Sequence, residues 1–305
     1  CGFSRRADTN GVSGALADHV DLPNLRALAA DAVRFDRHYS VTNPCGPSRA
    51  SILTGQYAMN HGAVRNGTPL PHDTPNLASE VRAGGYLPLL FGYTDSAPDP
   101  RSHAPGDPAL RSYEGVMPGF DETVEMRLEE SWPWRAHLLA KGYDVPPYPD
   151  IFRPDGTEPD DPALYAAEDS DTAFLTDRVI HDLRARPPGW FAHLTYIRPH
   201  PPLVAPAPYN KMYDPDRVPA PFTPQDRDAA RAAHPFNGAA LDARPFAANV
   251  EGLPDLAETD HNIARLRAIY LGLASEVDTH LGRVIGFLKE TGQYDDTLIV
   301  VTADH

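Results

Sequence analysis

The spacing of apolar residues divides the chain into candidate helices and candidate buried strands. In segment 171–186, Leu175, Val179 and Leu183 recur at helical spacing and define one apolar face. Short apolar runs without polar alternation are instead typical of strands that are buried on both faces. On these criteria we expect helices at 22–35, 74–86, 171–186 and 261–292, and strands at 86–94, 190–197 and 297–303.

Capping residues set the expected ends of two of these helices. Segment 74–86 has Thr74 in the N-cap position, Pro75 in the first turn, and Gly84 or Gly85 as the stop. Gly292 is expected to end the long helix at 261–292, because glycine readily adopts the left-handed conformation that follows a helix.

Helices that alternate with continuous apolar strands predict an α/β fold, with a mostly parallel sheet covered on both sides. Ligands of such folds bind at the carboxyl ends of the strands. Segments 95–170 and 199–260 are rich in Pro, Asp and Ala with weak periodicity, so we expect long loops and short helices there. The sequence shows neither an internal repeat nor a clear linker, which favours one catalytic domain over 1–305.

Composition narrows the range of partners. The 305 residues carry a net charge of −15, which disfavours a nucleic-acid partner. No apolar run approaches the ~20 residues that span a bilayer, so we expect no membrane partner. The two cysteines, Cys1 and Cys45, form no disulfide framework and fit a reducing compartment. The chain begins without Met and ends at "VVTADH", so we expect it to be truncated at both ends, with the first strand and a C-terminal part missing.

Cys45 lies in "SVTNPCGPSRASILTGQY" (40–57) and admits three interpretations. A free cysteine is most often a small buried hydrophobe. A thiolate phosphatase would need an arginine six positions further on, where this chain has Ser51. The third interpretation is a cysteine that a modifying enzyme recognises, because "CGPSR" (45–49) has the form C-x-P-S-R.

The C-x-P-S-R motif, followed by "ASILTG" (50–55), resembles the signature of the sulfatase branch of the alkaline phosphatase superfamily. The resemblance implies an alkaline-phosphatase-like three-layer α/β/α sandwich. It also implies that a formylglycine-generating enzyme oxidises Cys45 to formylglycine. A hydroxyl of the hydrated aldehyde, activated by a divalent metal, then attacks sulfur or phosphorus. Pro47 would open a helix at 47–55 whose amides face the anion, and Arg49 would orient the nucleophile or hold oxyanions.

"VVTADH" resembles the family's T-x-D-H-G metal motif, which implies a site built from Cys45, Asp304 and His305, with Mn²⁺ or Ca²⁺ as the usual ion. The family's other metal carboxylate follows the first strand, which we expect just before Cys1; Asp8 is not a close substitute. The glycine after Asp-His and a downstream substrate lysine are also missing, so we expect the metal site of this polypeptide to be incomplete.

Within this branch, the chain looks like the phosphonate monoester hydrolases, also described as phosphodiesterases. It lacks the G-K-W-H stretch of typical arylsulfatases near position 92. It has "YAMNHGAVRNG" (57–67), "GYT" and "PDPR" (92–101), and "YIRPHPP" (196–202) instead. The resemblance implies that Asn66 and Tyr93 bind the substrate and that His200 faces the leaving group.

Several further residues complete the expectation for the site. Asp95 stands where relatives tend to have a hydroxyl residue, and a carboxylate near an anionic substrate is unfavourable unless it binds a cation or points away. His61 and Arg65 are lesser candidates that we expect to be structural.

The sequence therefore predicts a metal-dependent hydrolase of phosphonate monoesters and phosphodiesters with a formylglycine nucleophile at Cys45, promiscuous toward sulfate esters. The alternatives are an arylsulfatase, and an inactive or truncated relative that only binds anions. The expected partners are a small anionic ester and the formylglycine-generating enzyme. We expect the full-length protein to be a homo-oligomer in the cytoplasm, with periplasmic and secreted locations left open by the missing N-terminus.

Overall fold

The computed structural model describes residues 18–35, 37–128, 130–221 and 227–305. The α-helices of the described residues are α1 (Pro23–Ala30), α2 (Cys45–Thr54), α3 (Ala58–His61), α4 (Leu77–Ala83), α5 (Trp132–Ala140), α6 (Asp171–Ala185), α7 (Arg227–Ala232), α8 (Pro235–Ala243) and α9 (Asp260–Glu290). The strands are β1 (Leu87–Gly92), β2 (Asp121–Glu125) and β3 (Trp190–Leu194). Short 3-10 turns lie at Pro100–Ser102, Pro108–Arg111, Asp150–Phe152, Ala167–Asp169, Tyr209–Lys211, Pro215–Arg217 and Phe246–Asn249.

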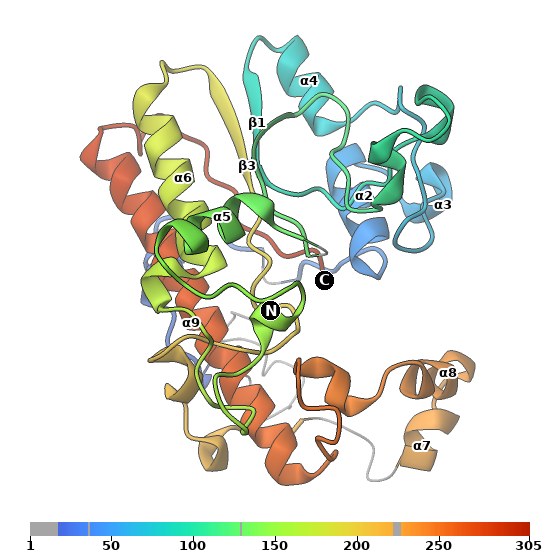
Figure 1. Cartoon of the computed structure of the whole chain (residues 1–305). Coiled ribbons are helices and arrows are strands. Elements are labelled where there is room, and N and C mark those ends of the chain that lie inside the picture. Colours follow the sequence, from blue (N-terminus) through green and yellow to red (C-terminus); the bar gives the residue numbers. More distant parts are fainter. Residues whose placement is uncertain (1–17, 36, 129, 222–226) are drawn as a thin grey trace.

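The strands form a parallel sheet in the order β2-β1-β3. Leu89 of β1 faces Ala192 of β3, and the pairing of β1 with β2 shifts register between Leu90 and Phe91. Helices α2 and α4 lie on one side of this sheet and α5, α6 and α9 on the other (Figure 1). This is the predicted α/β arrangement of a parallel sheet between helical layers.

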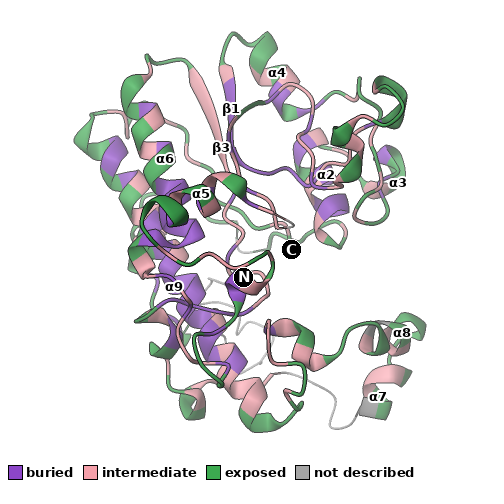
Figure 2. Ribbon diagram, in the orientation of Figure 1, coloured by how far each residue is buried: buried purple, intermediate pink, exposed green. Residues whose placement is uncertain are grey.

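Strand β1 carries the core on both of its faces. Leu89 and Phe91 pack with α5, α6 and α9 in the largest buried cluster. Leu90 points the other way and packs with Leu53 of α2 and Ala78 of α4. Successive side chains of a strand alternate between faces, so the continuous apolar run of β1 follows from its burial between two helical layers. Figure 2 shows β1 and the inner faces of α6 and α9 as buried.

The predicted helices at 171–186 and 261–292 are confirmed as α6 and α9, whereas two other helix boundaries were wrong. The predicted helix at 22–35 ends at Ala30, and Phe35 beyond it is 79% exposed. The predicted N-cap Thr74 is replaced by Asn76, whose side chain accepts the amide hydrogens of Ala78 and Ser79. The Ser79 hydroxyl in turn accepts from the Asn76 amide, which completes a capping box.

The predicted buried strand at 297–303 was wrong, because this segment is not part of any sheet among the described residues. Leu298 and Val300 are 90% and 76% exposed, whereas Ile299 between them packs on the main core. Side chains 298 to 300 therefore alternate between solvent and core, but a strand also needs a hydrogen-bonded neighbour. The strand predicted at 190–197 is shorter, and each residue of β3 is only partly buried.

The sequence analysis missed β2, which lies inside the segment 95–170 predicted as loops and short helices. Its sequence "DETVE" is polar, and only Val124 is buried, because β2 lies at an edge of the described sheet. The rest of 95–170 and 199–260 consists mainly of loops, 3-10 turns and short helices, as predicted. Over the described residues, none of the helices has the length and apolarity needed to cross a bilayer.

Candidate active site

Cys45 is the first residue of helix α2, so the predicted helix start at Pro47 was wrong. The amide of Gly46 donates to the Asn66 side chain (N to Oδ1, 2.9 Å), and Pro47 has no amide hydrogen. The expectation that the amides of this helix face an anion therefore fails for these two residues. The helix still directs the positive end of its dipole toward the site.

Asn66 holds the start of helix α2 against the loop that follows α3. Its Oδ1 accepts from Gly46, and its Nδ2 lies 3.9 Å from Cys45 Sγ. A Cβ at position 46 would lie 3.1 Å from Asn66 Oδ1 and 3.3 Å from Asn66 Cα. Glycine in the second position of C-G-P-S-R thus permits the close approach of Asn66 to the cysteine.

Arg49 lies one turn after Cys45, between two other predicted site residues. Its Nε donates to Asp304 Oδ2 at 2.9 Å, and its guanidinium lies 4.5 Å from the centre of the Tyr93 ring. Burial by itself lowers the pKa of Arg49. The net pKa is nevertheless raised, because nearby groups that are negative when ionised favour the charged guanidinium, with Tyr93 contributing most and Asp304 next. The side chain is therefore a fixed positive charge beside Cys45.

Tyr93 directly follows β1 and is 4% exposed. Burial raises the pKa of its phenol well above the ordinary value, although the charge of Arg49 opposes this shift. Tyr93 consequently keeps its proton at physiological pH and can donate a hydrogen bond to an anionic oxygen. Its place after a parallel strand agrees with the expectation that the site lies at the carboxyl edge of the sheet.

The predicted metal ligands come together. One candidate ligand atom from each of Cys45, Asp304 and His305 lies within 4.8 Å of the other two. The Ser48 hydroxyl donates to the backbone oxygen of Asp304, which anchors this segment to helix α2. The three residues fit a divalent cation as part of a larger ligand set, because Mg²⁺ and Ca²⁺ sites use six or more donors.

His200 lies in the loop after β3, at the same edge of the sheet as Tyr93. Its Nδ1 lies within hydrogen-bond distance of the Pro201 carbonyl oxygen, which can only accept, so Nδ1 carries a proton and Nε2 is the atom that can exchange one. The described structure records no hydrogen bond that joins His200 to Cys45, Asn66 or Tyr93. Its role in the site stays a prediction.

His61 is structural, as expected. The Ala63 amide donates to its Nδ1 (3.1 Å), so the ring proton is on Nε2 and is donated to Ser51 Oγ, 2.9 Å away. A histidine in this tautomer cannot activate the Ser51 hydroxyl as a base. Burial also lowers the pKa of His61. The pair instead ties the loop at 57–63 to helix α2.

Asp95 is buried, at 6% exposure, and its backbone φ is 55°. This is the left-handed region, which residues other than glycine rarely adopt. Its charge contributes to the raised pKa values of both Arg49 and Tyr93. The carboxylate that was unexplained in the sequence therefore belongs to the electrostatic surroundings of the site.

Ser48 is the site residue that the sequence analysis left without a role. A helix that begins at Cys45 places positions 48 and 49 on the same face as position 45, since residues three and four apart are neighbours. Correct placement of the helix start would have identified Ser48 together with Arg49.

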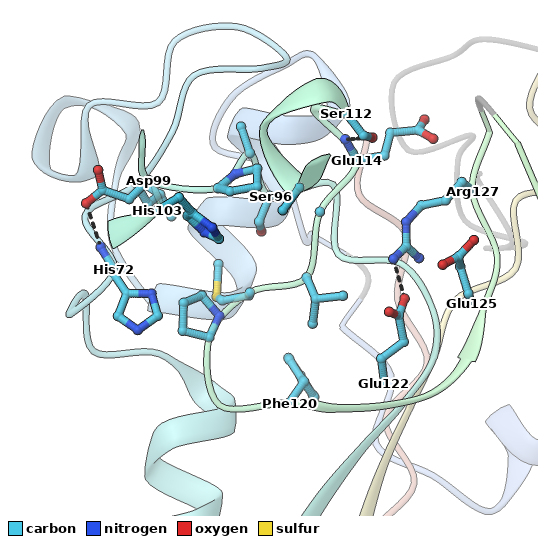
Figure 3. A pocket seen from close by; sticks show the side chains of 18 of the residues that line it. His72, Ser96, Asp99, His103, Ser112, Glu114, Phe120, Glu122, Glu125 and Arg127 are labelled. Atoms are coloured by element: carbon cyan, nitrogen blue, oxygen red, sulfur yellow. Dashed lines mark hydrogen bonds and ion pairs between the residues drawn. The ribbon is translucent and has the colours of Figure 1, made fainter. Parts of the chain in front are cut away.

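A separate cavity of about 610 Å³ lies beside the site. Figure 3 shows His72 and Asp99 on one side of it and Glu122, Glu125 and Arg127 on the other. None of Cys45, Arg49, Asn66, Tyr93, Asp304 and His305 lines this cavity. Its acidic lining is unfavourable for an anionic ester, so the chemistry suggested by Cys45 belongs to the neighbouring cluster.

A parallel sheet between helical layers, with a C-x-P-S-R helix start and an Asp-His pair at its carboxyl edge, defines a sulfatase-type member of the alkaline phosphatase superfamily. The sulfatase family profile matches residues 6–305, and the chain belongs to this family. Enzymes of the family generally depend on formylglycine and a metal ion.

Several relatives are phosphonate monoester hydrolases or related enzymes. The structure of a phosphonate monoester hydrolase from Silicibacter pomeroyi is 64% identical with a TM-score of 0.92, and the match covers 95% of this chain and 59% of that one. The corresponding enzyme of Agrobacterium radiobacter is 42% identical with a TM-score of 0.88, over 94% of this chain and 58% of that one. The multifunctional alkaline phosphatase superfamily protein PehA of Trinickia caryophylli is 40% identical over 93% of this chain and 57% of its own length. The chain thus spans somewhat less than three-fifths of the relatives that it matches.

Proposed function

We propose that the protein hydrolyses phosphonate monoesters and phosphodiesters with a formylglycine formed from Cys45. The observation that carries this proposal is the cluster of Cys45, Asn66 and Arg49 at the carboxyl edge of the sheet, in a chain that is 64% identical to a phosphonate monoester hydrolase. The Sγ atom of Cys45 marks the place that an oxygen of the hydrated aldehyde would take.

The reaction divides into a displacement at phosphorus and an elimination that restores the aldehyde. One hydroxyl of the hydrated aldehyde loses its proton and attacks phosphorus, the bond to the leaving oxygen breaks, and that oxygen receives a proton. The second hydroxyl then loses its proton, its oxygen forms the aldehyde double bond, and the phosphonate or phosphate leaves with the bridging oxygen. The second step needs no water to attack phosphorus, in contrast to the ester that a serine would form.

The side chains of the site have distinct parts in this scheme. The Asn66 amide, 3.9 Å from Cys45 Sγ, would orient the nucleophile. The permanent charge of Arg49 and the neutral phenol of Tyr93 would stabilise the phosphoryl oxygens. We assign proton transfer to the leaving group to His200, through Nε2.

Cys45, Asp304 and His305 would contribute ligands to the divalent ion. When bound, such an ion lowers the pKa of the hydroxyl and neutralises charge on the phosphoryl group. A hard ion such as Mn²⁺ or Ca²⁺ suits the carboxylate of Asp304 and the oxygen that replaces Sγ.

Charge favours a monoanionic substrate. Arg49 is already paired with Asp304, and Asp95 adds a further negative charge nearby. A phosphodiester or phosphonate monoester carries one negative charge, whereas a phosphomonoester approaches two at neutral pH. A sulfate ester is also monoanionic, so an arylsulfatase is the second candidate, supported by an arylsulfatase of Clostridium perfringens that is 26% identical over 98% of this chain.

The test combines mass spectrometry with turnover. After production with a formylglycine-generating enzyme, the peptide around Cys45 should lose about 18 Da, as expected for conversion of the thiol to the aldehyde. The modified enzyme should turn over 4-nitrophenyl phenylphosphonate and a bis(4-nitrophenyl) diester faster than 4-nitrophenyl sulfate. An unmodified thiol, with a control peptide converted in parallel, would reject the mechanism, and preference for the sulfate would favour the arylsulfatase. The homo-oligomer and the cytoplasmic location are further proposals that light scattering and fractionation can test.

A further inference from the structure

Arg198, two residues before His200, is one of the most deeply buried cations in the described structure. Its side chain is 2% exposed. Its Nε donates to Asp171 Oδ2 at 3.0 Å, and its Nη1 donates to the carbonyl oxygen of Pro202 at 2.9 Å and approaches that of His200 at 3.4 Å. One guanidinium therefore contacts the loop backbone on both sides of Pro201.

Rigid elements hold this guanidinium in place. Asp171 is the first residue of helix α6, is 4% exposed, and also accepts the amide hydrogen of Thr172 at 2.9 Å. The guanidinium lies 4.4 Å from the centre of the Phe152 ring, which belongs to the main core. The loop after β3 is thus fixed to the start of α6 through charged and aromatic contacts.

Stability alone is a poor explanation for such a pair. Removing both charges from water is unfavourable, and well-packed apolar residues are often as stabilising as a buried ion pair. Apolar residues cannot orient carbonyl groups, whereas the planar guanidinium of arginine donates to several acceptors in fixed directions.

We propose that Arg198, held by Asp171, is a positioning residue that fixes the direction of the His200 imidazole. The carbonyl groups of His200 and Pro202 are bound by Arg198, and His200 Nδ1 donates to the carbonyl group of Pro201 between them. The imidazole is therefore oriented through the same backbone that the guanidinium holds. This inference rests on the proposed function, in which His200 protonates the leaving group.

The experiment compares leaving groups in the full-length, formylglycine-containing enzyme. A phenyl ester needs proton transfer to its leaving oxygen far more than a 4-nitrophenyl ester does, because phenolate is the more basic. In Arg198→Lys and Asp171→Asn, kcat on the phenyl ester should fall about 10- to 100-fold, as expected for partial loss of general acid catalysis, and on the nitrophenyl ester less than about 3-fold. Two variants are used so that a failure of one to fold does not end the test.

His200→Asn and the double variant Arg198→Lys/His200→Asn separate the possible outcomes. If Arg198 acts through His200, adding Arg198→Lys to His200→Asn should leave the phenyl ester rate within about 3-fold, because residues that act as a unit are not additive. If Arg198→Lys lowers kcat equally on both esters, or if the losses of the two single variants add fully in the double variant, the positioning role of Arg198 is overturned while the role of His200 stands. If His200→Asn does not change the dependence on the leaving group, both the proposed role of His200 and the positioning role fail.

Arg265→Lys is the matched control. Arg265 is also a partly buried arginine, with 13% of its side chain exposed, and it pairs with Asp160 and Glu158 outside the His200 loop. We expect this variant to lower thermal stability without changing the ratio of the two ester rates. A change of that ratio comparable to the one in Arg198→Lys would show that the assay reports general loosening and would contradict the inference.

Discussion

Glu276 lies in the middle of helix α9 with only 1% of its surface exposed. Burial raises the pKa of its carboxyl from the ordinary 4.5 to about 8, and the charge of Asp171 adds to this shift. The nearby Ser170 hydroxyl and the charge of Arg198 oppose this shift only in part. Below pH 8 the carboxyl is therefore mainly neutral in the folded protein.

A raised carboxyl pKa makes stability fall as the pH rises. Between about pH 4.5 and 8 the unfolded chain releases the Glu276 proton while the folded protein keeps it, so rising pH favours unfolding. At about 1.4 kcal/mol per pKa unit, the full shift corresponds to roughly 5 kcal/mol at pH 8, an upper value for this single group. The stabilisation is complete below about pH 4.5 and is lost by about pH 8.

Glu276→Gln removes this titration and keeps the size of the side chain. Both proteins are unfolded in urea at pH 5, 6, 7 and 8. From pH 5 to pH 8, the free energy of unfolding of the variant should rise by about 2–5 kcal/mol relative to that of the natural protein. The difference between the two proteins cancels the other titrating groups.

Glu290→Gln on the same helix is the control, because the side chain of Glu290 is 65% exposed. The free energy of unfolding of this variant, relative to the natural protein, should change with pH much less than that of Glu276→Gln, because an exposed side chain keeps most of its hydration on folding. A constant difference for Glu276→Gln, within about 0.5 kcal/mol, would show that Glu276 does not have a raised pKa and would refute the reasoning.

Three further changes test the site and its surroundings. Gly46→Ala places a Cβ 3.1 Å from Asn66 Oδ1, so kcat/KM should fall about 10-fold or more through misplacement of the nucleophile while the melting temperature changes little. Asn76→Ala removes the cap of α4 and should cost about 1 kcal/mol in urea unfolding without an effect on kcat, and a change in kcat would contradict the separation of cap and site. Chelation by EDTA should abolish turnover, with Mn²⁺ or Ca²⁺ restoring it in the natural protein but not in Asp304→Asn; activity that survives exhaustive chelation would reject the metal site.

The sequence was sufficient to predict elements whose burial is complete and regular. The apolar run of β1 and the stripe of α6 predicted both elements, because each buries its apolar residues against well-packed neighbours. Strand β2 was missed since one buried residue, Val124, leaves no periodic pattern to recognise. The segment 297–303 shows the opposite error, because apolar content indicates a tendency to pair but does not supply the paired strand.

The site was predicted from its motifs, whereas its contacts required the structure. C-x-P-S-R and Asp-His identified Cys45, Arg49 and Asp304, and the structure brings them together. The ion pair between Arg49 and Asp304 joins residues 255 positions apart, which no local pattern can indicate. The hydrogen bond from the Gly46 amide to the Asn66 side chain was not predicted either, because it depends on the path of an intervening loop.

The separation along the chain between helix α2 and Asp304 also determines how much time passes between the synthesis of these two contact partners. The contacts of Arg49 and Ser48 with Asp304 span 255 and 256 residues. At about 5–20 residues per second, a ribosome needs roughly 13–50 s to proceed from one partner to the other. During that interval Cys45 has left the ribosome or is leaving it while the partner that closes its surroundings does not yet exist. In the proposed maturation, a formylglycine-generating enzyme would therefore have its best access to the thiol on the nascent chain, and slower translation of the intervening residues would lengthen that access.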